Sequence, residues 1–222
     1  MIYQLPAHVR MCHTARGPVF LDLKHNRYFG LALAGDTPLR KILNETTEEE
    51  EPAPPLIHQL VRTGLIEPRT DPCSHCAAPA FHPATISFLQ LITPDTFDGA
   101  SALRFIHAYL WARHAMHRRL WDVMKDLEQR RQRCDTPTTA AHVAMLSKGF
   151  HRLRPYTFTA RNQCLLHALA LLHYLASSRI AATWMIGVHT QPWGAHSWVQ
   201  WQDMVLDATP EQALRYTPIL IA

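Results

Sequence analysis

The chain has 222 residues, of which 47% are hydrophobic and 18% charged, a balance that supports a sizeable buried core and excludes global disorder. At roughly 100–200 residues per domain, this length predicts one or two domains. No apolar run approaches the roughly 18–20 residues that cross a bilayer, and residues 1–10 do not have the pattern of a secretory signal. We therefore expect a cytoplasmic protein with no membrane insertion.

The net charge of +4 is unevenly distributed. Residues 1–84 hold nine acidic and eight basic side chains, whereas residues 85–222 hold nine acidic and fourteen basic ones. Much of the excess falls in residues 113–133, a run that forms either a solvated helix face or a surface for a polyanion. The chain has five cysteines, and an odd number in a cytosolic chain favours free thiols over a disulfide framework.

The first third of the chain predicts a small mixed unit. Short segments of partly alternating hydrophobic residues are bounded by turn residues, a pattern that predicts strands joined by tight turns. The expected strands are residues 3–9, 19–23, 27–31 and 65–67, with a turn at residues 24–26. Two short helices are expected between the third and fourth of these strands, at residues 39–43 and 56–61, the second ending at Gly64. This order of strands and helices resembles a winged-helix arrangement.

A linker is expected next, because residues 68–83 contain four prolines and little periodicity. Cys73 and Cys76 within it have C-x-x-C spacing, but no second pair completes a zinc site, so we interpret them as incidental thiols and expect no metal. The remaining elements are predicted by hydrophobic periodicity. They are helices at residues 102–133, 138–152 and 165–175, then strands at residues 182–188, 197–201 and 204–207. The third helix lacks a polar face and should be buried beneath an antiparallel sheet.

The candidate chemistry lies in this last third of the chain. Cys164 opens the predicted buried helix, and Asn162 is an acceptable N-cap for it. A thiol at a helix N-terminus lies at the positive end of the macrodipole, which favours the nucleophilic thiolate. A buried cysteine also serves as a small apolar residue, so position alone leaves both interpretations open. His196 begins a predicted strand and would pair with the thiolate, although fifteen histidines in the chain make a structural role an alternative.

Strand register indicates which carboxylate would pair with the imidazole of His196. If the hairpin turn is at residues 202–203, Trp198 faces Asp207. Side chains alternate along a strand, so His196 and Asp207 share a face as diagonal neighbours, about 7–8 Å apart between backbones. Asp203 has the same parity but lies at the tip of the hairpin. Asp207 is therefore preferred as the group that would orient the imidazole.

Four sequence blocks around these residues resemble one known family, the lasso peptide maturation B proteins. The resemblance covers about Leu146 to Pro210 and consists of a Cys-Leu pair, then A-H-x-W-V about thirty residues later, then a hydrophobic pair ending in Asp. The blocks are Arg161–Leu165 with the leucine-rich helix after it, Met185–Val188, Ala195–Val199 and Val205–Asp207. The first third also resembles the small winged-helix domain that recognises precursors in ribosomal peptide maturation.

The resemblance implies an α+β fold in two domains. Residues 1–68 would form a winged-helix-like leader-recognition domain, residues 69–84 a linker, and residues 85–222 a transglutaminase-like, papain-like cysteine peptidase domain. By resemblance, Cys164 would be the nucleophile, His196 the base and Asp207 the orienting carboxylate.

The same resemblance implies a substrate and a partner. The enzyme would remove the leader of a lasso peptide precursor, so that an asparagine-synthetase-like cyclase can close the freed core amine into a macrolactam. The chain has no phosphate-cradling motif of its own, so no cofactor is expected and any ATP dependence would come from the cyclase.

Two other functions stay open at this point. The same three residues would serve a transglutaminase-like transfer to an amine in place of water. Alternatively, the chain would be a winged-helix nucleic-acid-binding regulator, for which the basic pI of about 8.9 is mild support. The excess of acidic residues in the winged-helix-like region argues against phosphate binding there, so we expect no nucleic-acid partner.

Overall fold

The computed structural model describes residues 3–31, 55–69, 82–93, 99–134, 137–157 and 163–222. The chain divides into two compact units, Met1–Ala78 and Pro79–Ala222. Among the helices of the described residues, none combines the length and apolar character that crossing a membrane requires. The helix expected at residues 39–43, the pair Cys73 and Cys76, and most of the expected linker lie outside the described residues.

The first unit contains an antiparallel sheet of three strands in the order β2–β3–β4. These strands are Val9–Thr14, Gly17–Asp22 and Arg27–Gly30. The hairpin expected around residues 24–26 is confirmed, because β3 pairs with β4 across that turn. The strand expected beside it at residues 3–9 is wrong, since the neighbour is β2. Buried positions in β2 are three residues apart, at Val9 and Cys12, so it lacks the alternation that reveals a strand.

The residues at the start of the chain pair elsewhere in this unit. Strand β1 (Tyr3–Gln4) runs antiparallel to β5 (Glu67–Pro68). Helix α2 (Pro55–Arg62) precedes β5 and buries Ile57 and Leu60 against hydrophobic residues of the sheet. The helix ends at Arg62, and Gly64 follows it as expected, with a φ of +71° that glycine adopts without steric cost.

The second unit is built on a sheet of five strands in the order β10–β7–β8–β9–β6. All neighbours in it are antiparallel except β6 and β9, which are parallel. The strands are β6 (Ile86–Ser87), β7 (Thr183–Thr190), β8 (Trp193–Trp201), β9 (Met204–Val205) and β10 (Thr217–Ile221). The central three were predicted from the sequence, whereas the two outer strands were not.

Helices pack on this sheet and on one another. They are α3 (Gly99–Ala115), α4 (Leu120–Arg131), α5 (Ala140–Leu153), α6 (Cys164–Ser177) and the short α7 (Pro210–Ala213), with 3-10 turns η1 (Phe88–Gln90) and η2 (Arg154–Tyr156). The single helix expected over residues 102–133 is wrong. The chain leaves the helix after Ala115 because Arg119 is extended, with φ −70° and ψ 137°, and Arg118 pairs with Asp126 of the next helix.

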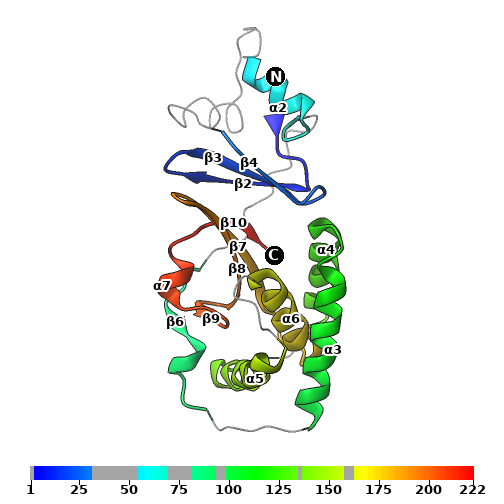
Figure 1. Cartoon of the computed structure of the whole chain (residues 1–222), viewed down its shortest axis with the longest axis vertical. Coiled ribbons are helices and arrows are strands. Elements are labelled where there is room, and N and C mark those ends of the chain that lie inside the picture. Colours follow the sequence, from blue (N-terminus) through cyan, green and yellow to red (C-terminus); the bar gives the residue numbers. More distant parts are fainter. Residues whose placement is uncertain (1–2, 32–54, 70–81, 94–98, 135–136, 158–162) are drawn as a thin grey trace. The chain divides into compact units, whose positions relative to one another are not determined.

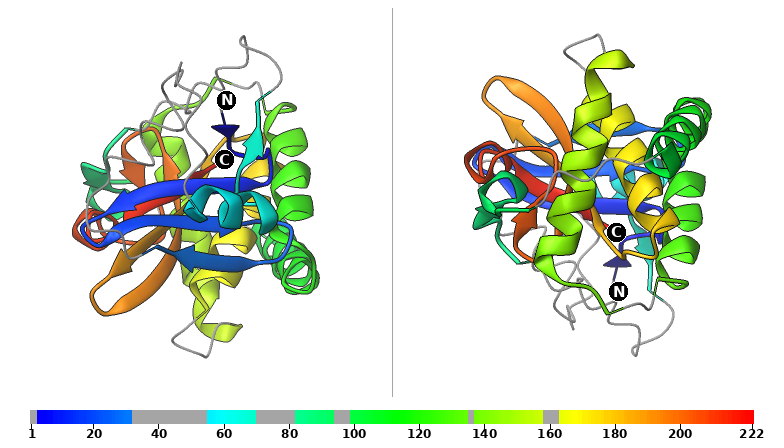
Figure 2. Two further views of the ribbon diagram at one scale, coloured as in Figure 1. Left: turned by 90° about the horizontal axis from the view of Figure 1, so that it is seen from above. Right: turned by 90° about the horizontal axis from the view of Figure 1, so that it is seen from below.

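Helix α6 is the centre of the second unit, as its apolar sequence predicts. It contacts α3, α4 and α5 as well as β7 and β8, and Figure 1 shows it between the sheet and α3. Both views of Figure 2 show the green helices α3 and α4 on one side of α6 and the orange hairpin β7–β8 on the other. Every residue from Leu166 to Leu175 is buried. Each fully buried leucine contributes about 1.5–3 kcal/mol by leaving water, so α6 is anchored along its whole length.

Candidate active site

Cys164 is the first residue of α6 and carries a free, half-buried thiol. The N-cap is Gln163, whose carbonyl accepts the His167 N–H at 2.9 Å, and not Asn162, which lies outside the described residues. The first N–H groups of a helix have no partner within it, and they point toward its N-terminus together with the positive end of the dipole. An anion attached at this position, whether a thiolate or a tetrahedral oxyanion, therefore meets a favourable field.

His196 lies in β8, directly opposite Gly187 of β7. Its ring stacks on Trp198 with centroids 5.9 Å apart and lies 5.2 Å from the ring of Tyr216. Burial lowers the pKa of His196; the Asp207 carboxylate opposes this shift, and His167 adds to it. A lowered pKa keeps the imidazole neutral near pH 7, which is the form that accepts a proton.

The backbone of Gly187, which pairs with His196, is closely covered by Tyr216 and Trp198. A Cβ placed on Gly187 would lie 2.7 Å from Tyr216 Cβ and 2.9 Å from Trp198 Cη2, closer than such atoms approach in proteins. Only glycine therefore allows both rings that touch His196 to lie against the sheet. The packing holds the imidazole between two aromatic side chains.

The hairpin that leads to Asp207 has the register predicted from the sequence. Trp201 pairs with Met204, and Gln202 in the turn has a φ of +54°. The Leu206 N–H donates to the Val199 carbonyl at 3.0 Å, one step further from the turn. Strand β9 itself ends at Val205, so Asp207 follows the ladder as a separate, locally held residue.

Asp207 connects β8 with α6. Its side chain is 3% exposed, and its Oδ1 accepts the Val199 N–H at 2.8 Å. Its Oδ2 lies 3.5 Å from Nδ1 of His167, whose side chain is 5% exposed. Asp203, by contrast, lies at the tip of the hairpin, where its carboxylate accepts a hydrogen bond from Thr85.

The structure brings the three predicted site residues into one unit without joining them directly. Within the described part of the chain, no hydrogen bond links Cys164, His196 and Asp207 to one another. The side chain that contacts Asp207 is that of His167, and the influence of Asp207 on His196 is electrostatic. Hydrogen bonds of catalytic groups often tighten only when substrate binds, so this spacing suits an unliganded site.

Two buried histidines beside the predicted residues were not predicted to belong to the site. His167 is three residues after Cys164, a spacing that places both on one face of the helix. Nε2–H of His151 donates a hydrogen bond to the Leu206 carbonyl at 2.8 Å, next to Asp207. Burial, with the neighbouring His167, lowers the pKa of His151 to about 4. The i+3 spacing of His167 from Cys164 could have placed it in the site from the sequence. No comparable sequence feature pointed to His151.

Metal-binding clusters and tryptophans are the remaining features to place. No cluster of three or more histidine, cysteine or acidic side chains suited to a metal occurs in that part of the chain. Two tryptophans of the sheet, Trp184 and Trp198, are 0% and 1% exposed and belong to the core. Trp193, the first residue of β8, differs from them because it is 53% exposed.

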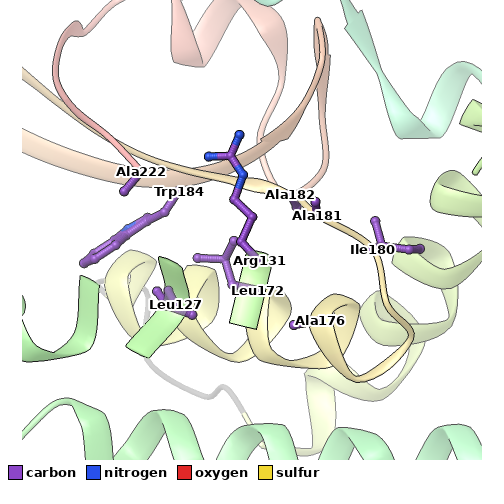
Figure 3. Close-up of a pocket in the computed structure, with 9 residues that line it drawn as sticks. All are labelled: Leu127, Arg131, Leu172, Ala176, Ile180, Ala181, Ala182, Trp184 and Ala222. Carbon is purple, nitrogen blue, oxygen red and sulfur yellow. The ribbon is translucent and has the colours of Figure 1, made fainter. Parts of the chain in front are cut away.

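A small cavity lies near the opposite end of α6 from Cys164, and Figure 3 shows its lining. Its volume of about 20 Å³ is room for about one water molecule. The lining residues are Leu127, Arg131, Leu172, Ala176, Ile180, Ala181, Ala182, Trp184 and Ala222. A peptide substrate does not fit there, so the cavity is a packing feature of the core.

Residues 106–221 match the family model of the transglutaminase-like superfamily, and the chain belongs to that superfamily. The matched segment includes Cys164, His196 and Asp207. Proteins of this class are generally enzymes, and the domain points to cysteine peptidase or acyl-transferase chemistry. No curated protein and no solved structure matches the chain significantly.

Proposed function

We propose that the protein is a cysteine peptidase that removes the leader peptide from a ribosomally made lasso peptide precursor. Cys164 is the nucleophile, His196 the general base and acid, and Asp207 the carboxylate that orients the imidazole. The observation that carries the proposal is a free thiol on the first residue of the buried helix α6, with a buried carboxylate bridging that helix and the strand of His196, in a chain of the transglutaminase-like superfamily.

The reaction is acyl transfer in two steps. The Cys164 sulfur attacks the carbonyl of the last leader residue, and the peptide C–N bond breaks as His196 gives a proton to the departing core amine. A thioester joins the leader to Cys164 until water, deprotonated by His196, attacks it and releases the leader carboxylate. Free N–H groups at the start of α6 stabilise the oxyanion of both tetrahedral intermediates.

The first unit is the proposed leader-binding, winged-helix-like domain. Its three-stranded sheet has edge strands β2 and β4, and an extended peptide can add to such an edge through backbone hydrogen bonds. Attachment of this unit to the peptidase raises the effective concentration of the scissile bond. An asparagine-synthetase-like cyclase is the proposed partner, and it supplies the ATP-dependent closure of the freed amine.

Transfer to an amine is the second candidate, because the superfamily includes acyl transferases and the thioester accepts either nucleophile. Product mass distinguishes the two reactions. Hydrolysis leaves a leader with a free carboxylate, whereas aminolysis leaves a leader amide.

The test is incubation of the full chain with its precursor peptide, with and without the cyclase and ATP, followed by mass spectrometry. Leader loss is expected from the wild type and not from Cys164→Ala or His196→Ala, while Asp207→Ala cleaves much more slowly. Cys134→Ala is the matched control, because that half-buried thiol belongs to the same unit as Cys164 but donates to the Arg130 carbonyl at 3.2 Å. Normal processing by folded Cys164→Ala would eliminate the peptidase assignment.

A further inference from the structure

The carboxylate of Asp207 has two oxygens with different partners. Oδ1 accepts the Val199 N–H at 2.8 Å, and Oδ2 faces Nδ1 of His167 at 3.5 Å. With 3% of the side chain exposed, water cannot replace either partner. A buried carboxylate that loses a partner keeps its desolvation penalty, so both contacts matter for where the group points.

His167 is held in place from several sides. Phe150 lies edge-on to its ring at 5.4 Å, and the ring of His151 lies 5.2 Å away. His151 is itself fixed by its hydrogen bond to the Leu206 carbonyl and by Phe88, which stacks on it at 4.7 Å. The imidazole of His167 therefore has little freedom to turn away from Asp207.

The orientation of that ring determines its chemistry toward the carboxylate. A nitrogen without a hydrogen would present its lone pair to the lone pairs of Oδ2, which is repulsive, so Nδ1 of His167 carries the proton. His167 then presents an N–H to the Asp207 carboxylate across the 3.5 Å contact. The titratable groups in contact with His167 are Asp207 and His151. His196 is coupled to it electrostatically, and Cys164 lies three residues earlier on its own helix.

We propose that His167 is a positioning residue, which holds the second oxygen of Asp207 and thereby fixes the carboxylate that orients His196. The inference rests on the proposed function, because it concerns the same three residues. It adds a fourth group to them, placed on the nucleophile's own helix. Helix, strand and carboxylate are thus aligned as one assembly before any substrate binds.

The test measures the reactivity of Cys164 without needing the substrate. Iodoacetamide alkylates thiolates, so its rate at Cys164 between pH 5 and pH 9, followed by peptide mass spectrometry, reports the thiolate–imidazolium pair. The variants are His167→Leu, which removes the donor, and His167→Asn, whose amide N–H replaces Nδ1–H. His173→Leu is the matched control, because His173 is equally buried on the same helix but packs against Trp111 and His107.

The expected result is a graded loss. At pH 6, His167→Leu lowers the Cys164 alkylation rate about tenfold, by analogy with the lower end of the loss that follows removal of the hydrogen-bond partner of a metal-binding histidine. His167→Asn restores most of that rate. His173→Leu leaves the rate and its pH profile unchanged even where it lowers the melting temperature.

The inference would be overturned by a wild-type profile for His167→Leu, by an equal loss for His173→Leu, or by no restoration in His167→Asn. A loss in His167→Leu as complete as that in His196→Ala would also overturn it, since His167 would then be the base. The proposed function fails separately, and takes this inference with it, if wild-type Cys164 reacts at pH 6 no faster than in His196→Ala.

Discussion

The two halves of helix α6 contain the same residue type in contrasting surroundings. His167 and His173 are 4% and 3% exposed, yet His167 faces the Asp207 carboxylate while His173 packs among rings, with Trp111 at 4.7 Å and His107 at 4.9 Å. The first half contains Cys164 and His167, which are polar groups of the candidate active site. In the second half, His173 packs against two rings of α3. Burial of a histidine thus says little about its role until its partners are known.

The largest expected effect is on the rate of precursor cleavage, when the carboxylate that contacts His167 is changed. Asp207→Asn keeps the shape of the side chain but removes the charge that supports a protonated imidazole, and it should lower the precursor cleavage rate on the order of 10³–10⁴-fold. Asp203→Asn, at the hairpin tip, is the matched control and should cleave at nearly the wild-type rate. Equal losses in the two variants would show that the hairpin, and not the carboxylate near α6, determines activity.

A second change tests the apolar packing that both halves share. Leu169 is 0% exposed in the middle of α6, and Leu169→Ala should lower the free energy of unfolding by about 2–5 kcal/mol. Leu103→Ala on α3, where the side chain is 71% exposed, should change it by less than about 0.5 kcal/mol. Urea denaturation measures both. A small effect at Leu169 would mean that α6 is not the central element of the core.

Acid should lower stability through buried histidines whose pKa is lowered in the folded chain. Burial, with the charge of Arg130 and with His107, lowers the pKa of His173 to about 4, below the ordinary 6.5. The unfolded chain then binds more protons between these pH values, so stability is complete above about pH 6.5 and falls as the pH drops toward 4, by at most about 3 kcal/mol for this residue.

The variant His173→Leu sharpens this prediction. Its free energy of unfolding should depend less on pH between 7 and 4 than that of the wild type, because one of the histidines with a lowered pKa is gone. His151 should maintain part of the dependence, since its pKa is also lowered to about 4. Urea denaturation at several pH values measures the slope, and an unchanged slope would show that His173 does not titrate as described.

The smallest expected effect concerns Gly187 of β7, which pairs with His196 of β8. Gly187→Ala would press a methyl group against Tyr216 and Trp198, and it should lower the free energy of unfolding by about 1–3 kcal/mol. Gly149→Ala is the control with the opposite sign, because its Cβ meets only Tyr174 Oη at 3.7 Å within a helix, where alanine stabilises by about 0.5–1 kcal/mol. Equal effects from both alanines would contradict the close packing at Gly187.

What the sequence predicted well was determined by local signals. The start of α6 near Cys164, the hairpin turn at Gln202 and the end of α2 at Gly64 each depend on a few adjacent residues. Strand register then followed from counting, because side chains alternate. These features placed the candidate cysteine, histidine and aspartate in one unit.

What the sequence did not predict depends on contacts between distant segments. Whether His167 points at Asp207 depends on how α6 turns against the sheet, which its uniformly apolar sequence does not specify. The break at Arg119 involves neither glycine nor proline, and the partner of Arg118 lies on the following helix. The parallel pairing of β6 with β9 joins segments more than 100 residues apart through two residues each. The sequence near each of these features has no pattern that predicts it.

The central claim is covalent acyl transfer at Cys164, and trapping the acyl-enzyme tests it most directly. The full chain is mixed with its precursor, quenched in acid within seconds, digested and analysed by mass spectrometry. We expect the intact chain, before digestion, to gain the mass of the leader minus one water, and hydroxylamine to remove that mass. Digestion should leave the C-terminal fragment of the leader on the peptide that contains Cys164, and His196→Ala should not form the adduct. Rapid leader release with Cys164 unmodified at every time point, or release by Cys164→Ala, would contradict the account.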